Sequence, residues 1–363
     1  MKKTIIIAAI ALAAAVSCTK EPVYSCNPGD EIQFCTGRTL GALGTKTAYG
    51  SDGWSGTNDR RIDWKNNDKI TIVCNECDGV TKSDYVITGA TSSGTAGLKI
   101  DPSSTNLLWG TGSHTFYVSY PSSVTFAESI GSYTGTITAS VAATQTGEAS
   151  GTSSAYVVTP EMTSQVLVSK KVTSPVEEGI SLDFTPLSTA IKMQITNNRG
   201  AAIQVASIAL QSTASQNLSG DFTAALGSWE YRSGETGYTK YPTCTAAGSN
   251  TTEVKITTTD GTNDYLEVAD KGTLTATFFL LPTADLYDLK FVITFSDDST
   301  LSTVIKRTDG ADDTANRVTF PVHKKSYVNG ILVPKGINWT SVYARDNEDY
   351  IVEDSLTGET YWK

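Results

Sequence analysis

Cys74 and Cys77 form a C-x-x-C pair, the spacing in this sequence that is best suited to cysteine chemistry. Such a pair can act as a redox dithiol or supply half of a zinc site. A redox pair normally opens a helix after a strand, but here it follows the strand-like run 69–73 and enters the turn signal Asp78-Gly79. No second C-x-x-C and no histidine pair completes a zinc site. We therefore expect a local disulfide or two free thiols at the end of a strand.

Other side chains give little support for catalysis. The sequence has two histidines, His114 and His323, and neither lies near a nucleophile motif such as G-x-S-x-G. The acidic pairs at 297–298 and 312–313 fall in turn-like segments that lack the spacing of a calcium-binding loop. We expect no catalytic residue, no bound metal and no cofactor.

The start of the chain indicates a covalent lipid site. A basic start precedes an apolar run over residues 5–16, which is shorter than the roughly 20 apolar residues that span a bilayer. This pattern predicts a secretory signal peptide over residues 1–17. The run ends in Ala15-Val16-Ser17-Cys18, which resembles the bacterial lipobox, although the lipobox prefers leucine where Ala15 stands. We expect cleavage between Ser17 and Cys18 and a lipid tether on Cys18; the alternative is an ordinary signal peptide that contains a cysteine.

The remaining cysteines do not form a complete disulfide framework. If Cys18 is lipidated, five are left, and an odd number cannot all pair within one chain. The pairing stays open for the following residues: Cys26, Cys35, Cys74, Cys77 and Cys244.

Length and charge narrow the class of protein. The chain has 363 residues, a formal net charge of −10 and 18% charged residues. Nucleic-acid binding needs clustered Lys and Arg, so we expect no nucleic-acid partner. β-Branched residues are plentiful, and the Ala, Glu, Lys and Leu excess of helical bundles is absent. These features predict an all-β protein with two cores of ordinary size.

Strands with one apolar face are the elements that must position any site. Apolar and polar residues alternate in many short runs, and two of them, 291–295 and 301–305, predict a hairpin. Such strands pack as sheets face to face, so we expect two β-sandwich domains in tandem.

The predicted domain boundary lies in a polar segment that contains a proline. Ser174–Gly179 places it near residue 176, which gives domains 39–176 and 177–363. The Gly-, Ser- and Thr-rich segments 91–95 and 144–154 are expected to be loops.

Four short segments give the sequence a resemblance to a known family. They are Glu31–Phe34 with Thr45–Tyr49, Ile62–Trp64 with Asp68–Ile72, His114–Pro121, and Leu182–Ile191. In these segments, in their order, in its lipobox-like start and in its all-β pattern, the chain resembles the fimbrillins, the type V pilins and related lipoproteins of Bacteroidales. The likeness is good in the N-terminal half and poor near the C-terminus.

The resemblance implies two transthyretin-like β-sandwich domains and export as a lipoprotein displayed at the outer membrane. In the family's polymerising pilins, an Arg-specific protease removes the lipid and the first strand, and a strand from another subunit fills the groove. Carried over to this chain, the removable strand is Glu31–Thr36 within the lipidated linker 18–38, and the cut lies between Arg38 and Thr39. Arg60-Arg61 is a competing cut site, and Arg38 as an ordinary loop residue is the alternative.

In the family's pilins the donor strand comes from the C-terminus. In this chain the corresponding stretch is the tail at about 340–363, where two strand-like runs precede an aromatic end. The alternative is that this tail packs on its own second domain. The donor-strand candidates are Val342, Tyr343, Tyr350, Ile351 and Val352.

Three functions remain open at this point. The first is a structural fimbrial subunit, which polymerises with other fimbrial subunits, attaches to a membrane through its lipid and adheres to host or bacterial surfaces. The second is a non-polymerising anchor or tip protein of the same fimbria, which would keep its lipid and first strand. The third is a cell-surface glycan-binding lipoprotein, whose exposed aromatic platform would include Trp54, Trp109 and Trp229.

Overall fold

The structure is a computed structural model of the chain, and it is almost entirely β. It describes residues 27–36, 46–49, 62–90, 96–173, 179–230, 241–305, 319–320, 322–323 and 325–333. Within these ranges, the only helical turn is the short 3-10 helix η2 (Met162–Ser164). None of the described segments forms a helix with the length and apolar character needed to cross a membrane.

The N-terminal half forms an eight-stranded sheet in the order β13-β1-β6-β5-β4-β7-β12-β14. Its strands are β1 (Phe34–Thr36), β4 (Lys69–Val73), β5 (Lys82–Thr88), β6 (Ala96–Ile100), β7 (His114–Tyr120), β12 (Leu167–Thr173), β13 (Ile180–Leu182) and β14 (Thr185–Pro186). The two outermost strands of this order, β13 and β14, are almost consecutive in the chain. The sheet therefore curls until its two edges meet at the closing segment, Ile180–Pro186, which pairs with β1 on one side and β12 on the other.

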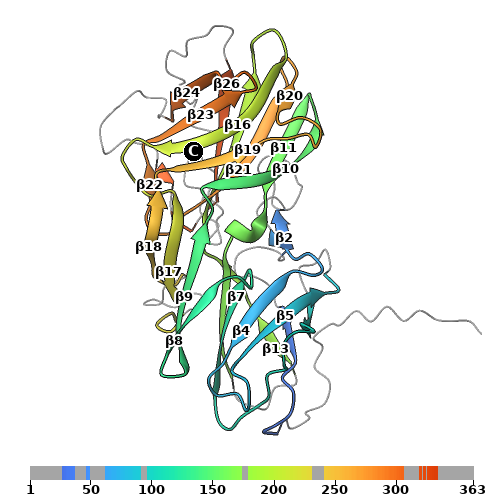
Figure 1. The fold of residues 1–363 in the computed structure, drawn as a ribbon, viewed down its shortest axis with the longest axis vertical. Coiled ribbons are helices and arrows are strands. Elements are labelled where there is room, and N and C mark those ends of the chain that lie inside the picture. The colour runs from blue at the N-terminus through green and yellow to red at the C-terminus, as the bar shows by residue number, and fades with distance from the viewer. Residues whose placement is uncertain are drawn as a thin grey trace, which may run out of the picture.

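A ten-stranded sheet forms the other end of the molecule, in the order β24-β23-β16-β19-β10-β11-β21-β15-β26, with β20 also paired to β16 (Figure 1). Its strands are β10 (Thr144–Thr152), β11 (Ala155–Pro160), β15 (Thr189–Asn197), β16 (Ile203–Ser212), β19 (Glu253–Thr257), β20 (Leu266–Val268), β21 (Thr273–Leu280), β23 (Leu289–Phe295), β24 (Thr300–Val304) and β26 (Lys325–Val333). The predicted hairpin is confirmed, because β23 and β24 pair in antiparallel register.

A four-stranded sheet in the order β18-β17-β9-β8 lies along one side of the molecule, between these two ends (Figure 1). Its strands are β8 (Thr125–Ser129), β9 (Ser132–Val141), β17 (Ser219–Ala225) and β18 (Cys244–Thr251). Two further pairs complete the described strands: β2 (Lys46–Tyr49) with β3 (Ile62–Asp63), and β22 (Leu286–Tyr287) with β25 (Thr319–Phe320).

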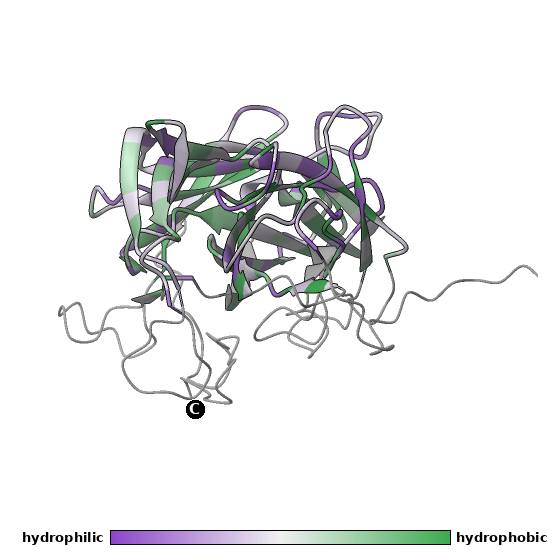
Figure 2. Cartoon of the chain, turned by 90° about the horizontal axis from the view of Figure 1, so that it is seen from below, coloured by the Kyte–Doolittle hydropathy of each residue, from purple (hydrophilic) through white to green (hydrophobic). Residues whose placement is uncertain are grey.

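Two hydrophobic cores hold these sheets together. The first core packs the inner face of the eight-stranded sheet, with residues such as Ile72 and Phe116, against the four-stranded sheet, with residues such as Phe222. The second core lies within the ten-stranded sheet and its neighbours. Apolar and polar residues alternate along many strands (Figure 2), because successive side chains of a strand point to opposite faces.

Strand β21 belongs to both cores. Phe278 packs into the second core, and its neighbour Phe279 packs into the first. The alternation therefore predicts one buried face of this strand correctly but misses that the other face is buried as well. Thr275 and Thr277, which the alternation places on the wet face, are also buried.

Sheet membership does not follow the predicted boundary near residue 176. The hairpin β10–β11 comes from the first half of the chain but pairs with β19 and β21 of the ten-stranded sheet. The closing segment comes from the second half but completes the eight-stranded sheet. The division into 39–176 and 177–363 stays a prediction, and the two halves exchange strands across it.

The prediction of a loop over 144–154 is wrong, because residues Thr144–Thr152 form β10. This strand has few apolar residues, so it shows no alternation of apolar and polar residues. The packing around it explains why small and polar residues stand there. A Cβ atom on Gly147 would lie 2.3 Å from the Val158 side chain, so the close approach of β10 and β11 requires glycine. Gln145 is 3% exposed, and its side-chain amide donates to Phe279 O at 2.7 Å and accepts from Phe279 N–H at 3.1 Å. The Gln145 amide thus makes the two hydrogen bonds that a neighbouring strand would otherwise make with the backbone of Phe279.

Candidate functional site

The first described residues, 27–36, are called here the N-terminal segment, and their first half runs beside the loop that precedes β7. Gly29 N–H donates to the carbonyl oxygen of Trp109 at 2.7 Å, and Ile32 N–H donates to that of Leu107 at 3.0 Å. The segment is therefore hydrogen-bonded to the protein before its regular strand begins.

Strand β1 then fills a gap in the curled eight-stranded sheet. It pairs in parallel with β13, where Phe34 lies opposite Ile180, and in antiparallel with β6, where Thr36 lies opposite Ala96. Of the strand predicted over residues 31–36, only Phe34–Thr36 forms β1, and Glu31 makes an isolated bridge. Both edges of this short strand are occupied.

Apolar side chains anchor the N-terminal segment in the first core. Ile32 is 2% exposed and Phe34 is 6% exposed. The Phe34 ring makes edge-to-face contacts with Tyr85 and Phe116, with ring centroids 5.2 and 5.3 Å apart. Burying a side chain of this size stabilises a fold by about 1.5–3 kcal/mol, so the two anchors together contribute several kcal/mol. Burial raises the pKa of Tyr85 to about 12, and its hydroxyl oxygen accepts Leu107 N–H at 3.3 Å.

The last residue of β1 holds its neighbour through its side chain. The Thr36 hydroxyl accepts Ala96 N–H at 2.9 Å and donates to Ala96 O at 3.2 Å. It satisfies both polar groups of one residue on β6, where removal of β1 would leave them without these partners.

The cysteines differ in state. Cys35, in the middle of β1, is disulfide-bonded. Cys74, Cys77 and Cys244 are free thiols, so the structure has the C-x-x-C pair as two thiols at the end of β4. Burial raises the pKa of Cys244 to about 12.

Most of the predicted processing and assembly residues lie outside the described part of the chain. These are the lipidation and cleavage residues Ser17 and Cys18, the maturation residues Arg38 and Thr39, and the donor-strand candidates Val342, Tyr343, Tyr350, Ile351 and Val352. Their roles stay predictions. Of the region in which these predictions fall, the structure describes the N-terminal segment and the strands around it.

The aromatic platform proposed for glycan binding is not formed by the described tryptophans. Trp109 is 1% exposed and Trp229 is 5% exposed, so neither can stack on a sugar. Trp54, the third candidate, lies outside the described residues. The expectation that Trp109 and Trp229 are exposed is wrong because both are core residues, with Trp109 packed edge-to-face on Phe116.

Both histidines make structural contacts with the backbone. His114 is fully buried, where Nε2 accepts Gly110 N–H at 3.0 Å and Nδ1 lies 3.0 Å from the Gly112 carbonyl. His323 places Nδ1 2.7 Å from the Leu187 carbonyl and stacks on Tyr241. Each imidazole thus fixes a turn or a contact between distant segments.

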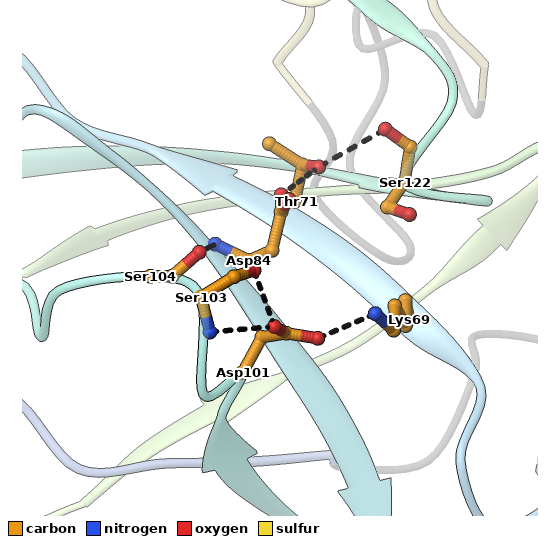
Figure 3. A network of polar contacts seen from close by, with 7 residues as sticks. All are labelled: Lys69, Thr71, Asp84, Asp101, Ser103, Ser104 and Ser122. Atoms are coloured by element: carbon orange, nitrogen blue, oxygen red, sulfur yellow. Dashed lines mark hydrogen bonds and ion pairs between the residues drawn. The ribbon is translucent and has the colours of Figure 1, made fainter.

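A polar network joins β4, β5 and the loop after β6 (Figure 3). Lys69 Nζ lies 2.6 Å from Asp101 Oδ2, and the other oxygen of Asp101 accepts the Ser103 hydroxyl at 2.6 Å. Thr71 donates its hydroxyl to Asp84 at 2.5 Å. Lys69 and Ser103 lower the pKa of Asp101 well below its usual range, and Asp101 raises the pKa of Lys69.

These pKa shifts decide what the network can do chemically. Amide formation between Lys69 and Asp101 would need a neutral amine and a neutral carboxylic acid. The shifts stabilise the charged form of both groups, so the contact is an ion pair that fixes the loop after β6.

Sequence reasoning missed two elements that contact the N-terminal segment, namely the closing segment and the loop 107–110. The closing segment contains Leu182–Phe184, which the sequence marks only as the start of a second domain, and nothing local shows that it pairs with residues 34–36. The loop 107–110 carries a weak sequence signal of burial: the apolar residues Leu107 and Trp109 are followed by Gly110 and Gly112. Both apolar residues are buried in the structure.

No family model matches the chain, and no curated protein sequence matches it significantly. Among solved structures, a proposed cell adhesion protein of Bacteroides uniformis is 13% identical, covers 84% of this chain and 92% of its own, and gives a TM-score of 0.46. A proposed cell adhesion protein of Bacteroides ovatus gives 0.45 at 13% identity, with the same two coverages. A fimbrial assembly protein of Parabacteroides distasonis gives 0.35 at 9% identity, over 84% of this chain and 91% of its own. With all three TM-scores below 0.5, these likenesses carry no argument about the function of this chain.

Proposed function

We propose that this chain is a structural subunit of a type V fimbria, exported as a lipoprotein and assembled by exchange of its first strand. Cys18 would carry the lipid that tethers the precursor to the outer membrane, and cleavage after Arg38 would release the lipid together with β1. A strand of a neighbouring subunit would then enter the slot. The assembled fimbria would serve adhesion and biofilm formation, with no catalytic step.

One observation carries this proposal: β1 is a short strand near the start of the chain that fills a gap in a closed sheet. It is the first strand that the structure describes, so in the described part of the chain it does not lie between two other strands. A strand placed in this way can leave without breaking the connection between any other two strands. An internal strand of the same sheet, such as β5, could not.

Removal of β1 would leave a site that requires a replacement. The facing edges of β6 and β13 would lose their hydrogen-bond partners, and the rings of Tyr85 and Phe116 would lose their contact with Phe34. Unpaired strand edges and an apolar slot together are the conditions for β-augmentation, in which backbone bonds supply affinity and side-chain pockets supply specificity. The predicted donor residues at the C-terminus, such as Tyr350 and Ile351, are apolar or aromatic, as such pockets require.

The experiment is cleavage of the purified precursor by an Arg-specific protease. We expect a new N-terminus at Thr39, release of the N-terminal segment and growth of filaments visible by electron microscopy. The matched control is Arg38→Lys, which keeps the positive charge but removes the cleavage site, and should stay monomeric. Mass spectrometry with and without reductant will show whether the disulfide of Cys35 leaves with the released peptide.

Two results would contradict this assignment. If Arg38→Lys is cut and polymerises like the wild type, with a new N-terminus after Arg60 or Arg61, maturation at Arg38 is wrong. If the wild type is cut at Arg38 but never forms filaments, the strand-exchange role is wrong.

A non-polymerising anchor of the same fimbria is the second candidate, and the structure offers one observation in its favour. The N-terminal segment is held by backbone bonds on both sides, by the buried Ile32 and Phe34 and by a disulfide at Cys35. A subunit that retains its first strand needs such anchoring. A precursor that resists Arg-specific protease while folded, and remains a lipid-tethered monomer, would support the anchor.

A further inference from the structure

We propose that Cys74 and Cys77 close into a disulfide as the chain folds, and that this bond braces the loop against which the N-terminal segment is held. The bond would form within one tight turn. Its formation is independent of the proposed function, whereas its consequence for release of the first strand rests on that function.

The turn brings the two cysteines close together. Cys74 follows β4, with its N–H bonded to the Thr81 carbonyl at 2.9 Å, and Asn75 and Glu76 are the central residues of a turn that ends at Cys77. The first and last Cα atoms of such a turn lie within about 7 Å of each other, and disulfides span about 4.4–6.8 Å between Cα atoms. The pair therefore needs little backbone movement to close.

Both thiols are inside the first core. Cys74 is 0% exposed and Cys77 is 8% exposed. The Cys74 thiol donates to Glu76 Oε2 at 3.2 Å, and the same oxygen accepts Thr115 N–H at 3.1 Å, so the carboxylate ties the turn to β7. Contact with Cys77 and burial raise the pKa of Cys74, which keeps it a thiol once folded. Since thiolate is the attacking species, the bond should form before burial of the turn is complete.

The turn lies against the support loop, residues 107–110. Asp78 N–H donates to the Leu108 carbonyl at 3.1 Å, and a Cβ atom on Gly110 would lie 2.1 Å from the Glu76 carbonyl oxygen. Leu108 also forms a β-bridge with Glu31 of the N-terminal segment. The support loop is thus held between the cysteine turn and the N-terminal segment, so a stiffer turn gives the segment a stiffer partner.

The redox step requires an oxidant, which we take to be a disulfide reagent such as oxidised glutathione. One cysteine thiolate attacks the reagent and forms a mixed disulfide, releasing one reduced glutathione. The second cysteine thiolate then attacks the protein sulfur of that mixed disulfide and releases another. The two protein thiols lose two protons and two electrons, and one reagent disulfide becomes two thiols.

The first test is peptide mapping of the full chain, refolded from its reduced and unfolded state with a mixture of oxidised and reduced glutathione. Free thiols are then alkylated and the protein is digested with trypsin. Residues 70–82 contain no internal Lys or Arg, so both cysteines fall in one peptide. We expect that peptide to carry no alkyl group and to be lighter by two hydrogens than its reduced form. Two alkyl groups on it, or a cross-link to the peptide of Cys35 or Cys244, would overturn the proposal.

The second test is hydrogen exchange at the amides of Ile32 and Trp109, which join the N-terminal segment to the support loop. We expect these amides to exchange up to about tenfold more slowly in the oxidised wild type than in Cys74→Ala/Cys77→Ala. The control is Cys244→Ala, a free thiol outside the turn, which should match the wild type. Equal exchange in all three proteins would overturn the bracing role. Neither test depends on cleavage at Arg38, so a failure of the pilin assignment would remain distinguishable from a failure here.

Discussion

The first and the last described strands of the chain are built in different ways. β1 has three residues and is paired on both edges, inside a sheet that closes on itself. β26 has nine residues and, among the described strands, is paired only with β15, at the end of the strand order. Taking away β1 therefore opens a slot with two unpaired walls, whereas taking away β26 would shorten a sheet by its outer strand. This difference is why the proposed exchange is assigned to the N-terminal strand.

A second contrast concerns side chains that replace backbone partners. Thr36 bonds both the N–H and the C=O of Ala96, and Gln145 bonds both groups of Phe279. The first lies at the end of a short terminal strand, and the second lies in the joint between the two cores. The same kind of side-chain hydrogen bonding thus holds both β1, which we propose to be removable, and the contact between the two cores, which must persist.

The largest expected effect is on the N-terminal anchor. Phe34→Ala should lower the free energy of unfolding by about 3–5 kcal/mol, because it removes a buried ring from between Tyr85 and Phe116. Val328→Ala, at a buried position of β26, should cost about 2 kcal/mol. Urea unfolding followed by circular dichroism measures both. If both variants lose the same free energy of unfolding, β1 is not anchored more strongly than β26.

The next effect compares the two side chains that replace backbone partners. Gln145→Leu should cost about 3 kcal/mol and Thr36→Val about 2 kcal/mol, because each leaves a buried N–H and C=O without these partners. The control is Gln194→Leu on β15, where a half-buried amide makes one long bond and the loss should be below about 1 kcal/mol. If Gln145→Leu unfolds at the same urea concentration as this control, the joint does not depend on the amide.

A smaller change of opposite sign is expected at the hairpin β8–β9. Ile130 is fully exposed with φ +51°, followed by Gly131 with φ +76°, which is the two-residue turn that favours Asn-Gly. Ile130→Asn should stabilise the fold by about 1 kcal/mol, because a β-branched residue is strained at positive φ. Ile130→Val keeps the branch and should bring no gain. Thermal unfolding distinguishes them, and equal gains would show that φ is not the cause.

The smallest effect is on acid stability, and it compares the two large sheets. The folded-state pKa values of Asp101 and Asp297 are both lowered, the first by Lys69 and Ser103 and the second by Ser299. Their contributions are present above the unfolded pKa of about 3.9 and are lost as the pH falls below it. Asp101→Asn should flatten the stability profile in that range more than Asp297→Asn, since Asp101 is in a direct ion pair with Lys69, whereas Arg199 makes only the smallest contribution to the lowered pKa of Asp297. The effect is modest because the Lys69 side chain is 52% exposed.

The sequence predicts the fold class and many strands, because alternation is a local property. Phe116, Val118 and Tyr120 mark β7, and the runs around Phe291 and Leu301 mark the hairpin β23–β24. It misses β10, whose partners require small or polar residues at Gly147 and Gln145. Residues distant in the sequence determine which side chains fit in β10, so its own sequence shows no strand pattern.

The candidate site was predictable in part for the same reason. A first strand over residues 31–36 follows from Ile32 and Phe34, two apolar residues on one face. The slot does not follow, because β13 and the support loop are far away in the sequence and carry no signal of what they touch. Pairing across such distances is a property of the folded chain.

The pairing of β1 has a mechanical consequence. A pull on its N-terminal end along the strand axis loads its hydrogen bonds to β13 and β6 together in shear and does not peel them off one by one. A lipid-tethered precursor would feel such a pull whenever the surface beneath it moves. The short strand then resists force through these bonds together, and cleavage on its C-terminal side would leave them to carry the load without the covalent chain. Single-molecule pulling from the N-terminus measures this, and a low rupture force would show that the strand peels.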